Sequence, residues 1–514
     1  MSTTIAIPAV QVTADGATLA TEALTRLVAV RVAVRLSAPA QCELTFAAPL
    51  ASNSFSLGSP LAVGVVGEGD LLFEGEVTAF EHVHGADGEA LFRVRGYDVL
   101  HRLRKRQEVR VHENVTVEEL AATLVADVGL SVDATVAGPR WARLFQHRQS
   151  DLELLGDVCD RSGLHFVAAH GRLRLITLDG FGDDVELSLG TTLQEARIEV
   201  NLETATERVG ALAWDPIAAE PIEAEADSPR VGRNVGVDTD PSAVGVDGHR
   251  TLIDESGLTA DHVEAAAQGW LDRRVARTVT LSGVADGDAR LRAGGRVELT
   301  GVGDDFAGAY VLTEAVHTID ASGYRTTISS RPPEPRPRPK GASVTLGRIT
   351  SVDDPDRLGR VRVALPAYGD VESVWFGVVV PAAGRDKGVV ALPDVDDTVL
   401  VALPHEDPAE GIVLGGLYGT VAPPDSGVDD DAVKRYTIRT PGGQRAVLDD
   451  GNERVLLTNS QGSHVELAPE HVRVFATTDL LIEAPGRSIT IRAKGIDFME
   501  APESEPVEPP EGGG

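Results

Sequence analysis

The sequence predicts a mainly β protein of several domains, with an α+β arrangement in the first part. At 514 residues the chain is longer than one hydrophobic core supports. Short stretches that alternate apolar and polar residues recur along its length, and turns rich in glycine and proline (53 Gly, 29 Pro) separate them. Helical spacing of apolar residues occurs in three segments, all within the first 280 residues.

Residues 1–330 are expected to form two barrel-like subdomains with packed helices. The clearest strands are Val30–Leu36, Leu71–Phe80 and Leu91–Tyr97, each alternating in polarity. Two capping boxes, Thr116–Glu119 and Ser150–Glu153, each begin a helix. After strands at 164–168 and 173–176, a third helix is expected over about 260–276, behind Thr259.

A proline-rich segment over 331–342 marks the clearest boundary in the chain. Prolines alternate with charged residues from Arg331 to Lys340, which removes backbone donors and favours an extended conformation. We expect a stiff, solvated linker.

Residues 343–422 are expected to form a small Greek-key barrel of the OB type. Six short strands are predicted within about 75 residues, and acidic turns such as Asp353–Asp356 and Asp394–Asp397 separate them.

Residues 435–499 form a repeating pattern of short alternating strands at intervals of roughly ten residues, with turns at Pro441–Gly443, Asp449–Gly451, Gln461–Gly462 and Pro485–Gly486. A single meander of this length cannot enclose a core, and its apolar faces and strand edges would stay exposed. Winding identical chains around one axis covers both, so this segment requires an oligomer. The core candidates are Ile438, Val455, Leu457, Val465, Leu467, Val472, Val474, Leu480, Ile482, Ile489 and Ile491.

The last fifteen residues, 500–514, contain five glutamates and four prolines without a basic residue, and we expect them to be disordered.

The net charge of −32 makes nucleic acid and anionic membranes poor partners for the chain as a whole. The N-terminal residues have no signal-peptide pattern and no apolar run is long enough to span a membrane, so we expect synthesis in the cytoplasm and no membrane-spanning segment. Cys42 and Cys159 lie among apolar residues and are expected to be buried thiols, with a redox pair as the alternative.

The motifs that would indicate catalysis, a cofactor or a metal are incomplete. Val352–Asp356 lacks the ligand spacing of a calcium loop, and His405–Glu406 lacks a second histidine and is followed by Pro408. His82 and His84 share a strand face without an evident third ligand. We therefore expect no catalytic, cofactor-binding or metal-binding residues.

Two groups of motifs resemble a known family. The segment Gly347–Pro366, followed in order by Trp375, Val380–Gly384, Leu392–Val401, Asp407–Pro408 and Val413–Tyr418, resembles the OB domain in spike proteins of contractile tails. Upstream, Tyr97–Asp98, Gln149–Leu155, Ser162–Gly163, Trp214–Pro216, Gly308–Tyr310 and Gly323–Tyr324 resemble the hub domain of VgrG-type proteins.

The resemblance implies a homotrimer in a phage tail-like particle, intracellular or released. Its hub at residues 1–330 would cap the inner tube and contact baseplate proteins. The segment 435–499 would form a trimeric β-helix or β-prism needle that pierces the target envelope. The resemblance also implies a PAAR-type tip protein and effector cargo, and Ile496, Phe498 and Met499 are the candidates for contacting the tip protein.

Two departures from the family narrow the expectation. The sequence shows no lysozyme-like insert between the OB domain and the needle, and the needle is short. Both features favour an extracellular contractile injection system or a simple phage tail over a typical type VI secretion spike. Two other functions remain as alternatives: a spike-borne peptidoglycan hydrolase, and a phage tail adhesin.

Overall fold

The computed structural model of the protein describes residues 9–47, 55–86, 90–215, 220–246, 248–253, 259–339 and 341–499. The chain divides into two compact units, residues 1–415 and 416–514, each treated by itself. The predicted disorder of residues 500–514 lies outside the described residues.

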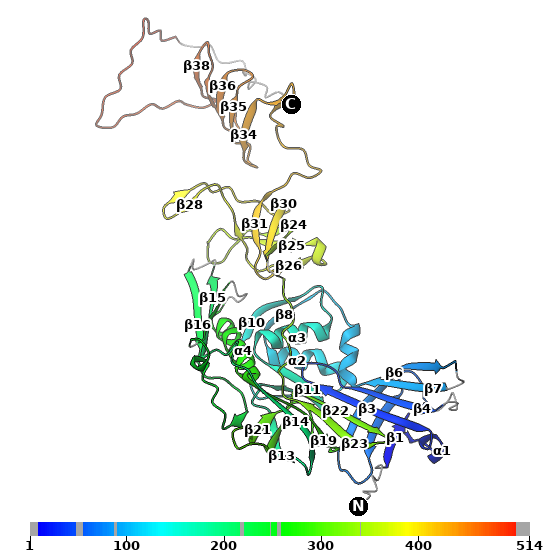
Figure 1. The fold of residues 1–514 in the computed structure, drawn as a ribbon. Coiled ribbons are helices and arrows are strands. Elements are labelled where there is room, and N and C mark those ends of the chain that lie inside the picture. The colour runs from blue at the N-terminus through cyan, green and yellow to red at the C-terminus, as the bar shows by residue number, and fades with distance from the viewer. Residues whose placement is uncertain are drawn as a thin grey trace, which may run out of the picture. The chain divides into compact units, whose positions relative to one another are not determined.

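One eleven-stranded sheet organises the first unit and confirms the mainly β prediction (Figure 1). Its spatial order is β14-β19-β23-β22-β3-β4-β7-β6-β5-β1-β2. The strands are β1 (Val10–Ala14), β2 (Ala17–Thr18), β3 (Leu27–Arg35), β4 (Gln41–Ala47), β5 (Pro60–Val65), β6 (Leu71–His84), β7 (Ala90–Tyr97), β14 (Leu193–Val200), β19 (Val279–Asp286), β22 (Glu314–Asp320) and β23 (Gly323–Ser329).

The sheet joins the beginning and the end of the first 330 residues. Strands β3 and β22 pair antiparallel from Val30–Ile319 to Arg35–Glu314, nearly 300 positions apart in the sequence. The expected two subdomains therefore share one sheet, in which β3 and β22 connect the early strands to the late ones.

Helices and small sheets pack around this sheet. The helical elements are α1 (Thr21–Leu24), η1 (Val99–Lys105), α2 (Val117–Val125), η2 (Ala126–Val128), α3 (Asp151–Arg161), η3 (Pro241–Ala243) and α4 (Ala260–Thr278). The small sheets contain β8 (Arg110–Thr116) with β10 (Arg140–Gln146); β9 (Ser131–Ala134) with β11 (His165–Ala169) and β12 (Arg172–Ile176); β13 (Phe181–Ser188) with β20 (Gly295–Thr300), β21 (Gly308–Val311) and β17 (Asn234–Val235); and β15 (Arg208–Asp215) with β16 (Glu220–Ala226) and β18 (His249–Leu252).

Both predicted capping boxes form. The Thr116 hydroxyl accepts from the Glu119 amide at 3.2 Å, and the Glu119 carboxylate accepts from the Thr116 amide at 2.9 Å. Ser150 and Glu153 make the same reciprocal pair at the start of α3. The apolar faces of α2 and α3 bury Leu120, Leu124 and Leu155 in a core of their own, as their 3.6-residue spacing predicts.

Cys42 in β4 and Cys159 in α3 are fully buried, and both are free thiols. Burial raises the pKa of each thiol far above its usual value. The expectation of buried thiols is confirmed.

The proline-rich segment has no strand or helix between Arg331 and Pro339, as its sequence predicts, but it is not a solvated linker. Pro332 is buried, and Arg336 binds residues from the first 330 positions of the chain. The amide and Nη1 of Arg336 donate to Oδ2 of Asp160 at 3.1 and 3.0 Å, and its Nη2 donates to the Ser37 carbonyl at 3.2 Å. The expectation of a solvated linker was wrong because Arg336 binds a buried carboxylate on α3. This carboxylate lies 176 positions earlier in the sequence, so the composition of the segment alone does not predict the contact.

Residues 342–416 form the predicted small barrel. Its strands are β24 (Ala342–Ser351), β25 (Arg362–Leu365), β26 (Val371–Glu372), β27 (Gly377–Val378), β30 (Thr398–Pro404) and β31 (Ile412–Gly416), with η4 (Pro366–Tyr368) and a short hairpin of β28 (Ala383–Gly384) and β29 (Lys387–Gly388). The sheet runs β26-β25-β24-β30-β31-β27, and paired hydrogen bonds between Val361 and Phe376 link its two ends. This closure buries a core of valine and leucine side chains around Phe376.

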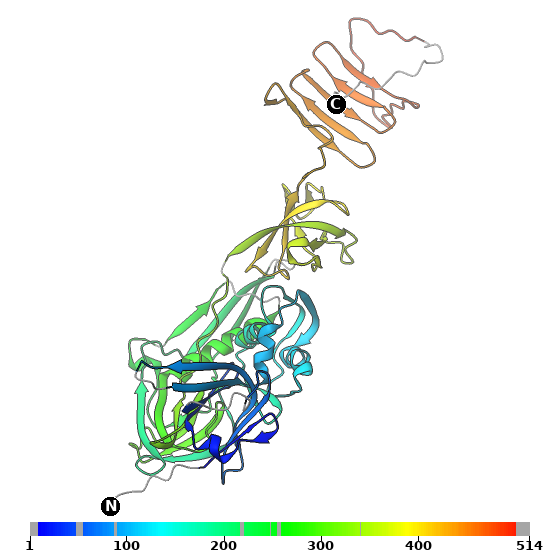
Figure 2. The same cartoon turned by 90° about the vertical axis from the view of Figure 1, so that its right-hand side faces the viewer.

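The second unit contains a hairpin of β32 (Val428–Asp429) and β33 (Ala432–Val433) and one five-stranded antiparallel meander (Figure 2). The meander strands are β34 (Arg435–Arg439), β35 (Arg445–Asp449), β36 (Arg454–Thr458), β37 (His464–Leu467) and β38 (Val472–Phe475).

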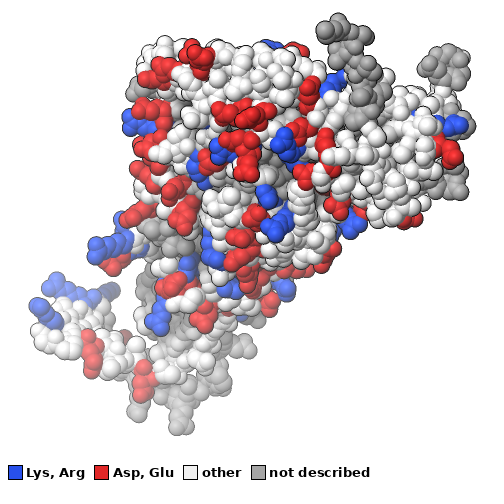
Figure 3. Space-filling view, turned by 90° about the horizontal axis from the view of Figure 1, so that it is seen from below, with Lys and Arg blue, Asp and Glu red and all other residues white. Residues whose placement is uncertain are grey.

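On the face drawn in Figure 3, Asp and Glu side chains lie scattered among Lys and Arg side chains, with uncharged surface between them. Within the described residues, no helix is both long and apolar enough to cross a membrane.

Candidate assembly surface

The meander has two faces of opposite character because its register is unbroken. Residues directly opposite one another on neighbouring antiparallel strands point to the same side of a sheet. The register therefore assigns every second residue of each strand to one face. Gly443 and Gly462 occupy the hairpin turns with positive φ (85° and 89°), a conformation that glycine adopts without strain.

One side, called here the apolar face, carries only hydrophobic residues on its paired positions. They form two rows across the five strands: Tyr436, Leu448, Val455, Leu467 and Val472, and Ile438, Ala446, Leu457, Val465 and Val474.

The apolar face is open to solvent in the single chain. Ile438 is 72% exposed, Leu457 54% and Val474 59%. An exposed, contiguous apolar surface of this kind marks an interaction site in a protein that stays soluble. Among the described residues no strand pairs with the outer edge of β34 or β38, so these edges add backbone donors and acceptors beside it.

The other side, called here the arginine face, is polar and already stabilised within the chain. Val447 and Leu456 are buried on it, and Arg454 binds Asp449 at 3.3 Å and Glu466 at 3.7 Å. Because this face is held together by its own contacts, the apolar face is the one that needs a partner.

Seven of the core candidates lie together on the apolar face: Ile438, Val455, Leu457, Val465, Leu467, Val472 and Val474. Ala446 and Leu448 were not predicted because β35, a strand between two glycine-containing turns, was not recognised; Tyr436, in the predicted strand β34, was also left out. The apolar run Ala446–Leu448, bounded by the turns at Gly443 and Gly451, is the signal that identifies β35.

The remaining candidates lie beyond the sheet. Over the described residues 476–499 no strand forms, so the strands expected at 480–484 and 488–493 are absent from the single chain. The apolar side chains of this segment are solvent-exposed: Leu480, Ile482, Ile489, Ile491, Ile496, Phe498 and Met499. A lone strand has no neighbour to satisfy its backbone groups, which accounts for the difference.

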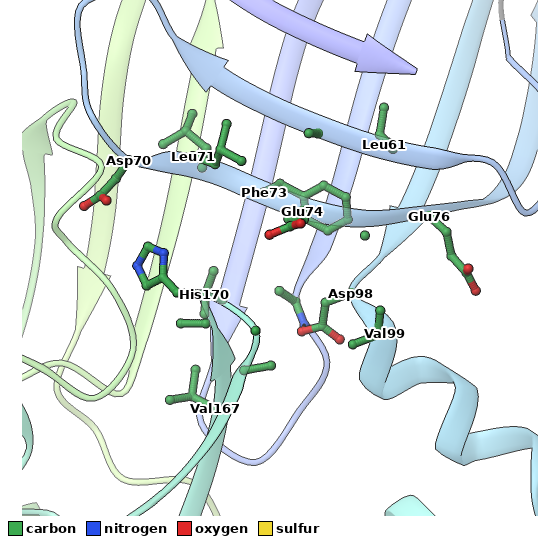
Figure 4. A pocket seen from close by; sticks show the side chains of 18 of the residues that line it. Leu61, Asp70, Leu71, Phe73, Glu74, Glu76, Asp98, Val99, Val167 and His170 are labelled. Atoms are coloured by element: carbon green, nitrogen blue, oxygen red, sulfur yellow. The ribbon is translucent and has the colours of Figure 1, made fainter. Parts of the chain in front are cut away.

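A cavity of about 640 Å³ lies in the first unit and is lined by residues from β5, β6, η1 and β11 (Figure 4). Asp98 borders it, and its carboxylate accepts from the Ala40 amide at 2.8 Å and the Leu100 amide at 3.0 Å. Burial raises the pKa of Asp98 to about 7. Glu76 binds His101 at 2.5 Å and also binds Arg102. Asp98 therefore caps the start of η1, and Glu76 connects β6 to η1.

Within the described part of the chain, no group of three His, Cys, Asp or Glu side chains is placed to hold a metal ion. His82 packs against Phe92 with ring centroids 4.8 Å apart. The carboxylates of Glu119 and Glu153 accept capping hydrogen bonds, which holds the pKa of each below its usual value.

Two protein-family models match the chain. The type VI secretion system/phage-baseplate injector OB domain matches residues 345–418, and the Alg8 N-terminal domain matches residues 52–321. A search of curated proteins finds no match.

Solved structures share the fold at low sequence identity. The half-lidded PdpA–VgrG complex of Francisella has a TM-score of 0.55 at 8% identity, over 92% of this chain and 88% of that one. A lidless PdpA–VgrG complex has a TM-score of 0.54 at 9% identity, over 91% and 98%. The E. coli c3393 protein has a TM-score of 0.53 at 15% identity, over 76% and 96%. It is described as a component of the type VI secretion system with structural similarity to the T4 bacteriophage tail proteins gp27 and gp5.

The chain thus has the architecture of VgrG-like spike and hub proteins, with an OB domain of the injector type. Because the second family match spans more than half of the chain, the protein belongs to the family defined by the Alg8 N-terminal domain.

Proposed function

We propose that this protein is the homotrimeric central spike of a contractile injection machine. The observation that carries the proposal is the apolar face, on which all ten paired positions are hydrophobic and which no described segment of the second unit covers. Three copies around one axis turn these faces inward and form a continuous core. Cyclic symmetry also closes the strand edges.

The needle extends through residues 476–499 in this proposal. Ile482, Ile489 and Ile491 prolong the core, and their strands form when neighbouring copies supply the backbone partners that a single chain lacks. The exposed Ile496, Phe498 and Met499 follow and seat a PAAR-type tip protein.

Within the machine, residues 1–330 cap the inner tube and contact the baseplate, the proline-rich segment joins this hub to the OB domain at 343–422, and the needle at 435–499 transmits force to the target envelope. The role is mechanical and requires no catalytic residue. The injector OB domain and the shared VgrG fold support the proposal. A complex with PdpA is recorded for the Francisella relative, which supports effector cargo as a further partner.

A paired substitution in the extension tests the needle. Ile489→Asp with Ile491→Asp places six carboxylates near the axis of a trimer, whereas both positions are solvent-exposed in the single chain. We expect particles that assemble a sheath and tube but lack a stable spike, seen by electron microscopy. Ser488→Asp with Thr490→Asp, at the intervening positions, is the matched control and should leave the spike intact.

Two results would contradict the proposal. One is normal particles with full injection activity from the Ile489→Asp/Ile491→Asp variant. The other is turnover of purified peptidoglycan by the full chain, because that result assigns it the chemistry of a hydrolase.

A further inference from the structure

The acidic charge of the chain is not shared by its C-terminal strands. Residues 435–499 contain eight arginine or lysine residues and eight aspartate or glutamate residues, whereas the whole chain carries a net charge of −32. The acidic surplus therefore lies outside the needle segment.

Within the meander, positive charge is concentrated on the arginine face. Its paired positions include five arginines (Arg435, Arg439, Arg445, Arg454 and Arg473) but only two acids, Asp449 and Glu466. Both acids pair with Arg454, and Asp425 pairs with Arg435 at 3.0 Å. The remaining three arginines leave this face with a surplus of positive charge.

Arg439 and Arg445 lie directly opposite each other on β34 and β35. Like charges at directly opposed positions destabilise a sheet unless an anion lies between them. Among the described residues no carboxylate lies within 4.0 Å of either guanidinium, and Nε of Arg445 is buried without a hydrogen-bond partner.

One further group on this face has unused capacity for an anion. The Arg473 guanidinium lies 5.0 Å from the centre of the Phe475 ring and makes no ion pair among the described residues.

We propose that the arginine face binds the phosphates of anionic lipids when the needle meets its target membrane. Guanidinium groups match phosphate oxygens in geometry as well as charge, and basic clusters gain free energy at anionic membrane surfaces. The inference rests on the proposed function, because the trimer buries the apolar face and leaves the arginine face as the outer wall. Three copies then present three Arg439–Arg445 pairs.

The acidic remainder of the chain does not oppose this local contact. At physiological ionic strength, exposed charges are screened over about 8 Å, so the side chains that meet the membrane decide the interaction. A long nucleic acid would extend past the needle toward the acidic surplus, and this favours a membrane over a nucleic acid as the partner.

Vesicle co-sedimentation of the full-length protein tests the inference. The probes are vesicles of phosphatidylcholine alone and of phosphatidylcholine mixed with phosphatidylglycerol. We expect binding to the mixed vesicles that weakens as salt is added, and no binding to phosphatidylcholine alone. Arg439→Gln with Arg445→Gln should weaken binding at least about twenty-five-fold, the loss for one of the three pairs, since each basic residue near such a surface changes affinity about fivefold.

Three further measurements keep the outcome interpretable. Arg439→Lys with Arg445→Lys keeps the charge and should retain most of the binding. Arg172→Gln with Arg250→Gln removes the same charge from exposed positions in the first unit and should have no effect. The mass of each variant in solution reports assembly, so a failure to trimerise is recognised as a failure of the proposed function.

Four results would overturn the inference: a trimer that does not bind mixed vesicles, unchanged binding by the Arg439→Gln/Arg445→Gln trimer, an equal loss from the first-unit control, or displacement of the vesicles by a low concentration of single-stranded DNA or polyglutamate. The last result would assign the face to another polyanion.

Discussion

Leu457→Asp separates the fold of the single chain from its assembly. Leu457 lies at the centre of one apolar row and is 54% exposed in the single chain. An aspartate there stays solvated in a monomer, and we expect the unfolding free energy of that monomer to change by less than about 0.5 kcal/mol.

The same substitution is costly in a trimer. Burying the exposed half of a leucine side chain contributes about 1 kcal/mol per copy, which is lost. Burying a carboxyl group without a partner costs about 2 kcal/mol more per copy even when it is protonated. Over three copies the sum is about 9 kcal/mol, or roughly six orders of magnitude in the association constant.

Sedimentation velocity at micromolar concentration measures the effect, and circular dichroism checks the fold. We expect Leu457→Asp to sediment as a folded monomer. Thr458→Asp, one residue along and on the arginine face, is the matched control and should remain trimeric. A Leu457→Asp protein that remains trimeric, or a Thr458→Asp protein that dissociates equally, would refute the assignment of the two faces.

Three other predictions concern the first unit. Burial lowers the pKa of His165 to about 3 and the pKa values of His262 and His317 to about 4, so below about pH 6.5 the unfolded chain binds protons that the folded chain excludes. The free energy of unfolding should therefore decrease as the pH is lowered, by about 2 kcal/mol per histidine at pH 5. In thermal unfolding, the stability of His317→Gln should depend less on pH than that of the exposed control His84→Gln. Arg336→Ala should lower the free energy of unfolding of this unit by about 2 kcal/mol, measured in urea, because the buried Asp160 loses its ion-pair partner. The control Arg385→Ala, at a 96% exposed side chain, should have no effect. Equal urea midpoints for the two variants would contradict the role of Arg336. Cys42 and Cys159 should react with a thiol reagent only after unfolding, and rapid labelling of the native protein would show that one of them is accessible.

The sequence predicted the local features of the fold well. The capping boxes at Thr116 and Ser150 placed two helices because the groups that satisfy each other lie three residues apart. The alternation of apolar and polar residues in Val30–Leu36 and Leu91–Tyr97 likewise predicted two strands of the large sheet, because this pattern is contained in the residues of a single strand.

Contacts between distant residues were not predictable in this way. The pairing of β3 with β22 and the binding of Arg336 to Asp160 join residues more than 170 positions apart, and neither has a signal in periodicity or composition. The strands expected near Ile482 and Ile489 are missing from the described residues of the single chain, although Ser488–Ala493 alternates as regularly as β38. A strand needs a partner as well as a pattern.

The mass of the purified full-length protein in solution tests the central claim most directly. The account predicts a single species of three times 54.2 kDa at micromolar concentration. Hydrogen exchange on the same sample should then show protection of residues 480–493. A protein that remains at 54.2 kDa under these conditions would contradict the account, because its apolar face would have no partner.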